Sequence, residues 1–243
     1  MKKAFDGFEN IAVTSVSSWV NERSCSSPIL GRYQNSVIGN GVNTEIYRHY
    51  GGVQDEVKTA YGIPVDKKMV LFVTARFSLN PDDIKGGHFL ADLAELMQND
   101  DFVFVIVGSD GTKLDLPDNV INVGRVENQT KLAQLYSVAD VSIVLSRKET
   151  FSMPCAESLC CGTPVVGFKA GGPESVSLKE YSEFCEYGEI TALKQLILKW
   201  ANFKKTEHGE KISDVACSNY DMDKMAKEYL KIYWNLLGAK KNG

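Results

Sequence analysis

Residues 139–168 read ADVSIVLSRKETFSMPCAESLCCGTPVVGF. Two short runs of apolar residues, 140–146 and 164–168, flank a segment with apolar residues at helical spacing, 153–162. A strand, a helix and a second strand joined by short turns make a βαβ unit, in which the two strands are parallel. The stretch therefore predicts a parallel sheet covered by helices.

The same alternation continues toward the N-terminus. Further strands are predicted at 69–74, 102–108 and 119–124, and further helices at 86–98 and 130–139. The strand at 119–124 follows its predecessor so closely that a loop could replace the crossover helix. Because strands that are apolar throughout are buried on both faces, we expect an α/β fold with a Rossmann-like, doubly wound parallel sheet from about residue 69 to 190.

The flanking regions have a different character. Near the N-terminus, 10–17 is a single strand-like run followed by a Ser-rich stretch, and residues 1–38 look too short for an independent domain. At the other end, 192–203 and 222–237 are predicted as two amphipathic C-terminal helices separated by the polar stretch 206–221.

Composition excludes several classes of protein. A net charge of -4 gives no general attraction to nucleic acid or to anionic lipid. The six cysteines lack C-x-x-C spacing, so we expect reduced, structural thiols. No run approaches the roughly 18 to 20 apolar residues of a membrane span. We expect a cytoplasmic protein, or one held at a membrane surface through a longer form or its acceptor.

Cations and acids follow the predicted strands, where ligands bind in open α/β sheets. Arg76 ends the strand 69–74 and Lys85 precedes the next helix, so the two could clamp a diphosphate or could simply be surface cations.

The segment 140–168 supplies a second set of candidate ligand-binding residues. Pro154 stands where a helix begins, which would leave first-turn amides as an anion site. Glu149 and Glu157 are eight positions apart and could reach a sugar and a ribose, or could be a turn residue and a helix-face charge. Gly171 and Gly172 allow positive φ and close backbone approach, so they could close a third side of the ligand cleft or could simply form a turn from strand to helix.

Taken together, these segments resemble the C-terminal domain of family 4 glycosyltransferases, which have the GT-B fold. The resemblance covers about residues 39–185 and includes ARF, DDIKGG, VGSDG, NVGRV and the stretch quoted above. It implies a retaining, metal-independent transferase that moves a hexose from a nucleoside-diphosphate sugar, a UDP-sugar or a GDP-sugar, to a glycan or glycolipid acceptor. No cofactor or bound metal is expected.

The resemblance also implies site residues. Arg76, Lys85 and Glu149 would be catalytic, the two cations on the donor diphosphate and the acid at the sugar hydroxyls. Glu157 would bind the ribose. The implied donor-binding set is Arg76, Lys85, Gly124, Arg125, Val126, Thr150, Phe151, Ser152, Met153 and Glu157. Many family members have glycine at the position of Ser152, and we expect serine to be tolerated there only if φ is negative.

GT-B enzymes have two Rossmann-like domains, which implies a domain plan. Residues 1–38 would be a remnant of the N-terminal acceptor domain, 39–48 the interdomain linker, 49–215 the donor domain and 216–243 a C-terminal crossover helix. The expected partner is an N-terminal GT-B domain, in the same chain or a separate one.

Two other functions stay open: a nucleotide-sugar-binding module or partner subunit without catalysis, and a related GT-B enzyme such as a sugar-nucleotide epimerase. The D-x-D match at Asp221 and Asp223 begins a predicted helix, so we interpret it as capping rather than metal binding. His49, His88 and His208 have no partners at metal-ligand spacing.

Overall fold

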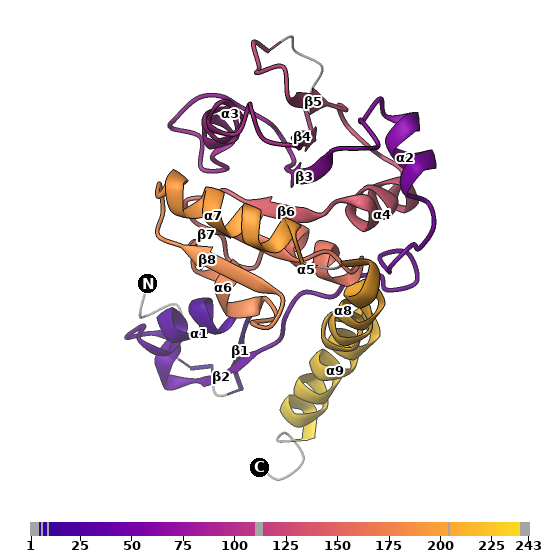
Figure 1. Ribbon diagram of the computed structural model, residues 1–243. Coiled ribbons are helices and arrows are strands. Elements are labelled where there is room, and N and C mark those ends of the chain that lie inside the picture. The colour runs from indigo at the N-terminus through magenta and orange to yellow at the C-terminus, as the bar shows by residue number, and fades with distance from the viewer. Residues whose placement is uncertain (1–4, 6, 9, 110–113, 204, 239–243) are drawn as a thin grey trace.

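A six-stranded, entirely parallel sheet forms the centre of the computed structural model (Figure 1), which describes residues 5, 7–8, 10–109, 114–203 and 205–238. Its strand order is β5-β4-β3-β6-β7-β8. The bounds are β3 (Lys68–Val73), β4 (Phe102–Val107), β5 (Val120–Asn122), β6 (Val141–Val144), β7 (Val165–Phe168) and β8 (Ser182–Cys185). The doubly wound α/β fold is confirmed, although β8, with the sequence SEFC, was not predicted because it has no apolar run.

Helices cover both faces of this sheet. They are α2 (Gln54–Ala60), α3 (Gly87–Leu96), α4 (Gln129–Val138), α5 (Met153–Cys160), α6 (Gly172–Val176) and α7 (Ile190–Ala201). Neighbouring residues of β3 point to opposite sides: Leu71 joins the core under α4 and α5, whereas Phe72 joins the core under α3 and α7. The described residues of the connection from β4 to β5 contain no helix, as the short gap suggested.

The N-terminal region forms a small unit of its own. β1 (Ala12–Ser15) and β2 (Gln34–Val37) pair in parallel as a separate two-stranded sheet, with α1 (Ser18–Cys25) and the 3₁₀ helix η2 (Leu30–Arg32) between them. In Figure 1 this unit lies beside α6. A Cβ on Gly171 would lie 2.2 Å from the Trp19 ring, so the turn before α6 needs glycine for this contact.

The polar stretch predicted between the two C-terminal helices is itself a helix, α8 (Lys205–Tyr220), followed by α9 (Met222–Gly238). The helix was not predicted because its apolar stripe is narrow: Ile212, Ala216 and Tyr220 are buried at intervals of four residues in an otherwise polar sequence. Residue 216, the predicted start of the crossover helix, lies inside α8, and the break between α8 and α9 comes at Asp221.

α8 is fixed to α5 by a buried hydrogen bond. The Ser213 hydroxyl donates to the Cys160 carbonyl over 2.5 Å. None of the described helices is long and apolar enough to cross a membrane.

We predict that Ile212→Ala lowers the free energy of unfolding by about 2 to 5 kcal/mol, the usual range for deleting a buried aliphatic side chain. Val215→Ala on the same helix is the control, because Val215 is 38% exposed. Urea denaturation of both variants measures the difference. Equal and small losses would mean that α8 is not packed as described.

Candidate active site

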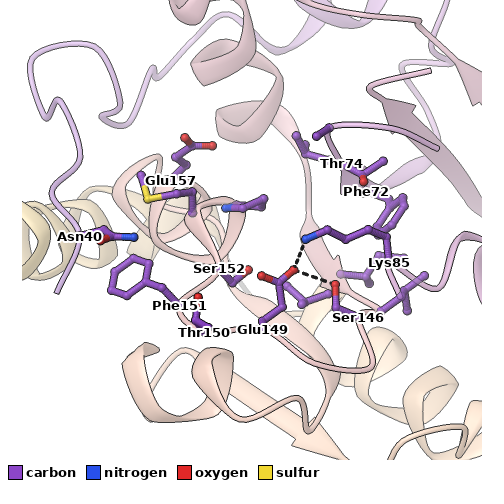
Figure 2. Close-up of a pocket in the computed structure, with 17 residues that line it drawn as sticks. Asn40, Phe72, Thr74, Lys85, Ser146, Glu149, Thr150, Phe151, Ser152 and Glu157 are labelled. Carbon is purple, nitrogen blue, oxygen red and sulfur yellow. Dashed lines mark hydrogen bonds and ion pairs between the residues drawn. The ribbon is translucent and has the colours of Figure 1, made fainter. Parts of the chain in front are cut away.

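A cleft of about 420 Å³ opens at the carboxyl ends of β3 and β6. The strand order reverses between these neighbours, since β4 and β5 continue to one side and β7 and β8 to the other. Ligands of open α/β sheets bind at such a switch point, because the loops leaving the two strands diverge there. The lining residues come from the ends of both strands, the loops that follow them, the start of α5 and Asn40 (Figure 2).

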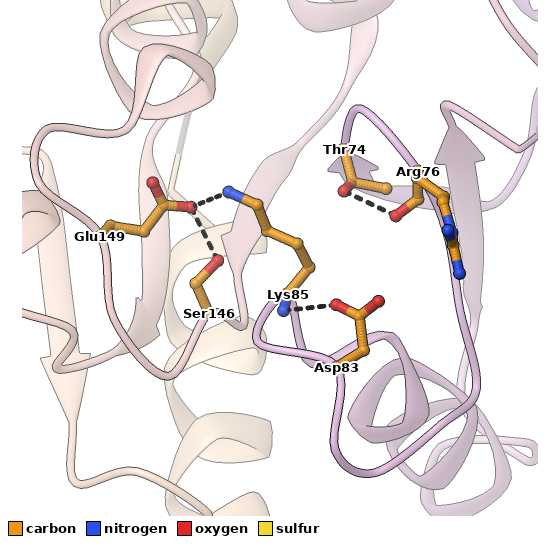
Figure 3. A network of polar contacts seen from close by, with 6 residues as sticks. All are labelled: Thr74, Arg76, Asp83, Lys85, Ser146 and Glu149. Atoms are coloured by element: carbon orange, nitrogen blue, oxygen red, sulfur yellow. Dashed lines mark hydrogen bonds and ion pairs between the residues drawn. The ribbon is translucent and has the colours of Figure 1, made fainter.

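An ion pair bridges the two sides of the cleft. Lys85 Nζ lies 2.6 Å from Glu149 Oε1, and the Ser146 hydroxyl donates to the same oxygen over 2.8 Å (Figure 3). The Lys85 side chain is 37% exposed and that of Glu149 is 15% exposed, so the pair faces the cleft without being sealed from water.

Lys85 reaches this position because the loop before α3 is held against the end of β6. The Arg147 amide donates to the Ile84 carbonyl over 2.8 Å. Gly86 has a φ of 70°, and a Cβ there would lie 2.2 Å from the Leu145 carbonyl oxygen. Only glycine allows both this left-handed φ and this close approach.

Glu149 is fixed through its backbone. Its amide donates to the Ala170 carbonyl over 3.0 Å, and its carbonyl accepts from the Gly172 amide over 2.9 Å. The turn itself is held by Glu174, whose carboxylate accepts from the amides of Ala170 and Gly171. Gly171 and Gly172 do not line the cleft, so of the two predicted roles the strand-to-helix turn is the one observed, and this turn supports the loop that carries Glu149.

The start of α5 places a helix N-terminus at the cleft. Ser152, Met153 and Pro154 line the cleft, and Pro154 stands in the first turn as predicted. The early amides of a helix have no intrahelical acceptor, and the helix dipole adds partial positive charge there.

The expectation of a negative φ at Ser152 is wrong. Its φ is 78°, and no other non-glycine residue in the described ranges has a positive φ. Its side chain makes no capping hydrogen bond. The turn from the Glu149 loop into α5 imposes this conformation, so Ser152 carries backbone strain of about 1 to 2 kcal/mol.

Glu157 lies across the cleft from Lys85 (Figure 2). Its Oε2 accepts a hydrogen bond from the hydroxyl of Tyr136 over 3.0 Å. Burial raises the pKa of the Glu157 carboxyl above its ordinary value, and the Tyr136 hydrogen bond partly offsets that effect.

Several predicted residues are not at the cleft. Arg76 is exposed and does not line it, and Figure 3 shows its guanidinium turned away from Lys85 and Glu149. Gly124, Arg125 and Val126 follow β5 and also lie outside the lining. The Arg125 guanidinium is 3.7 Å from the Glu127 carboxylate on the surface.

The predicted residues that do line the cleft are Lys85, Glu149, Thr150, Phe151, Ser152, Met153 and Glu157.

Sequence reasoning missed Thr74 and Asn40, which also line the cleft. Thr74 follows β3, and its hydroxyl donates to the Arg76 carbonyl over 3.1 Å, so a polar residue at a strand end was the available signal. Asn40 lies between β2 and α2, and its contact with the cleft depends on tertiary packing.

The D-x-D match caps a helix, as predicted. Asp221 accepts from the Lys224 amide over 2.9 Å and from the Thr44 hydroxyl over 3.0 Å. These hydrogen bonds hold the pKa of the Asp221 carboxyl below its ordinary value. Among the described residues there is no cluster of histidine, cysteine and acidic side chains that could hold a metal ion.

Comparison with known proteins identifies the family. Residues 53–214 match the family model described as glycosyl transferases group 1, and the chain belongs to that family. It is 24% identical over 202 residues to N-acetyl-alpha-D-glucosaminyl L-malate synthase of Bacillus anthracis, an alignment that covers 77% of this chain and 51% of that one. The chain therefore spans about half the length of that relative.

Solved structures share the fold. A glycosyltransferase from Rickettsia africae ESF-5 aligns with a TM-score of 0.81 at 20% identity, covering 100% of this chain and 67% of that one. The Anabaena protein HepE, solved in complex with UDP-glucose, aligns with a TM-score of 0.74 at 21% identity, covering 98% of this chain and 66% of that one. These alignments match the sheet described above to the C-terminal Rossmann-like domains of GT-B glycosyltransferases.

We predict that Ser152→Gly stabilises the protein by about 0.5 to 1 kcal/mol, because relief of the left-handed φ exceeds the entropy that glycine adds to the unfolded chain. Ser17→Gly is the matched control. Ser17 caps α1 at a φ of -152° and accepts from the Val20 amide over 3.3 Å, so its loss gives no relief. Urea denaturation compares the two. A destabilised Ser152→Gly protein would contradict the strain at this position.

Proposed function

We propose that this chain is the donor-binding half of a retaining glycosyltransferase, which takes a hexose from a UDP-sugar or GDP-sugar and passes it to a glycan or glycolipid acceptor. The observation that carries the proposal is the gathering of Lys85, Glu149, Glu157 and the start of α5 around one cleft at the switch point. A cation, a helix N-terminus and two acids suit the diphosphate and the hydroxyl groups of a nucleotide sugar.

The charges suggest an order along the bound donor. The diphosphate lies between Lys85 and the first-turn amides of α5, and the sugar hydroxyls face Glu149. The ribose lies toward Glu157, and the base extends toward Gly124, Arg125 and Val126. Arg76 joins the diphosphate only if its exposed side chain turns from its present position, which is within the ordinary rotamer freedom of a surface arginine.

The reaction we propose needs no metal and no protein base. As the bond between the anomeric carbon and the donor diphosphate breaks, negative charge builds on the leaving phosphate, and Lys85 stabilises it. The acceptor hydroxyl attacks from the same face, so configuration is retained, and its proton passes to the leaving phosphate.

The binding-module alternative gains support from one contact. An acid at the sugar hydroxyls favours an enzyme, because nucleotide binding alone does not require it. Its ion pair with Lys85 gives it a second reason to be present, since it holds the cation in place before any ligand arrives. Only an assay of transfer separates the two functions.

We predict that the 243-residue chain binds at least one of UDP, GDP and ADP in calorimetry. Glu157→Ala should weaken that binding by about 1.5 to 3 kcal/mol, the scale of hydrogen bonds to a charged group. Glu95→Ala is the control, because Glu95 is an exposed acid on α3 and does not line the cleft.

The absence of saturable binding with all three nucleotides would overturn the donor-site proposal. An unchanged affinity in Glu157→Ala would instead remove only Glu157 from the site.

We also predict that the chain alone does not transfer sugar and that adding a matching N-terminal GT-B domain produces transfer. Catalysis needs an acceptor hydroxyl held beside the anomeric carbon, and such positioning contributes about 7 to 11 kcal/mol to lowering the barrier. A radiolabelled-donor assay with glycan and lipid-linked acceptors measures this.

The control for that assay is Glu149→Ala in the two-domain protein, which should abolish transfer. Robust, acceptor-dependent transfer by the 243-residue chain alone would show that it contains a complete active site.

A further inference from the structure

Tyr136 brings a polar atom into the core directly behind the cleft. It is one of the largest fully buried side chains, with an exposed fraction of 0%. It does not line the cleft, yet its hydroxyl donates to Glu157 Oε2 over 3.0 Å. A buried hydroxyl costs free energy unless it is hydrogen-bonded, so this contact fixes the positions of both side chains.

The position of Tyr136 is itself fixed from two sides. The Thr163 hydroxyl donates to the Tyr136 carbonyl over 2.5 Å, which ties the end of α4 to the turn before β7. The Tyr47 ring packs edge-on against the Tyr136 ring with a centroid distance of 6.4 Å. A fully buried, closely packed ring has little room to move, so it can define the orientation of a neighbour.

We propose that Tyr136 is a positioning residue of the donor site: its buried hydroxyl holds Glu157 Oε2, so that the other carboxylate oxygen accepts from the ribose hydroxyls of the nucleotide. This proposal rests on the donor-binding function proposed above. The Glu157 backbone carbonyl accepts from the Cys161 amide within the helix, whereas its carboxylate accepts from the Tyr136 hydroxyl.

Tyr136 also acts on the charge of Glu157. Burial raises the pKa of this carboxyl, and the Tyr136 hydrogen bond lowers it. The other titratable groups nearby are Tyr47 from the linker, Cys160 and Cys161 at the end of α5, Cys217 from α8 next to Cys160, and Lys85 and Glu149 across the cleft. Burial holds the pKa values of Tyr47 and Tyr136 above the ordinary value for tyrosine, so both stay neutral donors at neutral pH.

Loss of the Tyr136 hydroxyl should make the Glu157 carboxylate easier to protonate. Without the tyrosine hydroxyl, the Glu157 pKa rises further, so the carboxylate becomes protonated at a higher pH. A neutral carboxyl is a poorer acceptor for ribose hydroxyls than a carboxylate. The nucleotide affinity of Tyr136→Phe should therefore be lower at neutral pH, and its decline on acidification should begin at a higher pH than in the unsubstituted protein.

The experiment is calorimetry of the 243-residue chain with whichever of UDP, GDP and ADP it binds, repeated across the acidic and neutral pH range. We expect Tyr136→Phe to weaken binding about tenfold at neutral pH and to shift the acidic decline upward. Tyr47→Phe removes a hydroxyl from the same buried cluster without a hydrogen bond to Glu157, and it should change neither quantity.

A double-mutant cycle tests whether Tyr136 acts through Glu157. In a Glu157→Gln background, Tyr136→Phe should cause little additional loss of affinity. If the two losses add, or if Tyr136→Phe matches the unsubstituted protein in affinity and pH profile, the positioning role is overturned. A chain that binds no nucleotide at all would instead refute the donor-site function.

A second readout applies if Tyr136→Phe does not fold. With 3-fluorotyrosine incorporated, the fluorine resonance of residue 136 should move when nucleotide is added and when Glu157 is replaced by glutamine. A resonance that responds to neither change would overturn the proposal.

Discussion

The pairing of β3 with β6 is the contact on which the rest of the site depends. It runs through Val70 with Val141 and Leu71 with Ser142, and it joins the two halves of the sheet at the position where the strand order reverses. Because the loops that leave these strands diverge, a cleft must open between them. Lys85 from one loop and Glu149 from the other then become neighbours, although 64 positions separate them in the sequence.

Close approaches of the backbone keep this cleft narrow. Gly86 lies against the Leu145 carbonyl, and Gly172 lies against the backbone of Thr150 and Phe151. A side chain at either glycine would separate the loop from the strand end that it contacts. The ion pair, the Glu149 loop and the strained turn at Ser152 are thus parts of a single, tightly connected edge of the sheet.

A buried polar network connects this edge to the layer behind it. The Ser158 hydroxyl donates to Ser142 Oγ over 2.7 Å, which links α5 to β6, and Thr163 links the turn before β7 to α4. Buried hydrogen bonds of this kind specify one arrangement of helices on the sheet, since any shift would leave a polar group unpaired. Tyr136 extends the network to Glu157 and so to the cleft.

The sequence by itself determined the parallel sheet, because its central strands are apolar on both faces and alternate with helices of period 3.6. It also indicated that Lys85, Glu149, Glu157 and the start of α5 line a cleft, because each stands close after a strand or near a helix terminus. The sequence did not identify β8 or α8, because each has few apolar residues. Those residues are recognisable as a buried face only once the neighbouring elements that cover them are known. The sequence could not decide the φ of Ser152, which the surrounding turn imposes against the local preference of serine.

Tertiary structure alone decided which predicted residues meet. Lys85 reaches the cleft because Gly86 can approach the end of β6, whereas Arg76, at the end of β3, points away from the cleft. Asn40 follows β2, which belongs to the separate two-stranded sheet, and Tyr136 lies within α4, so nothing local to them indicated a site at the six-stranded sheet. Their places depend on how the segment after β2 and helix α4 pack against the sheet, and packing of that kind is a property of contacts between distant segments rather than of any one segment.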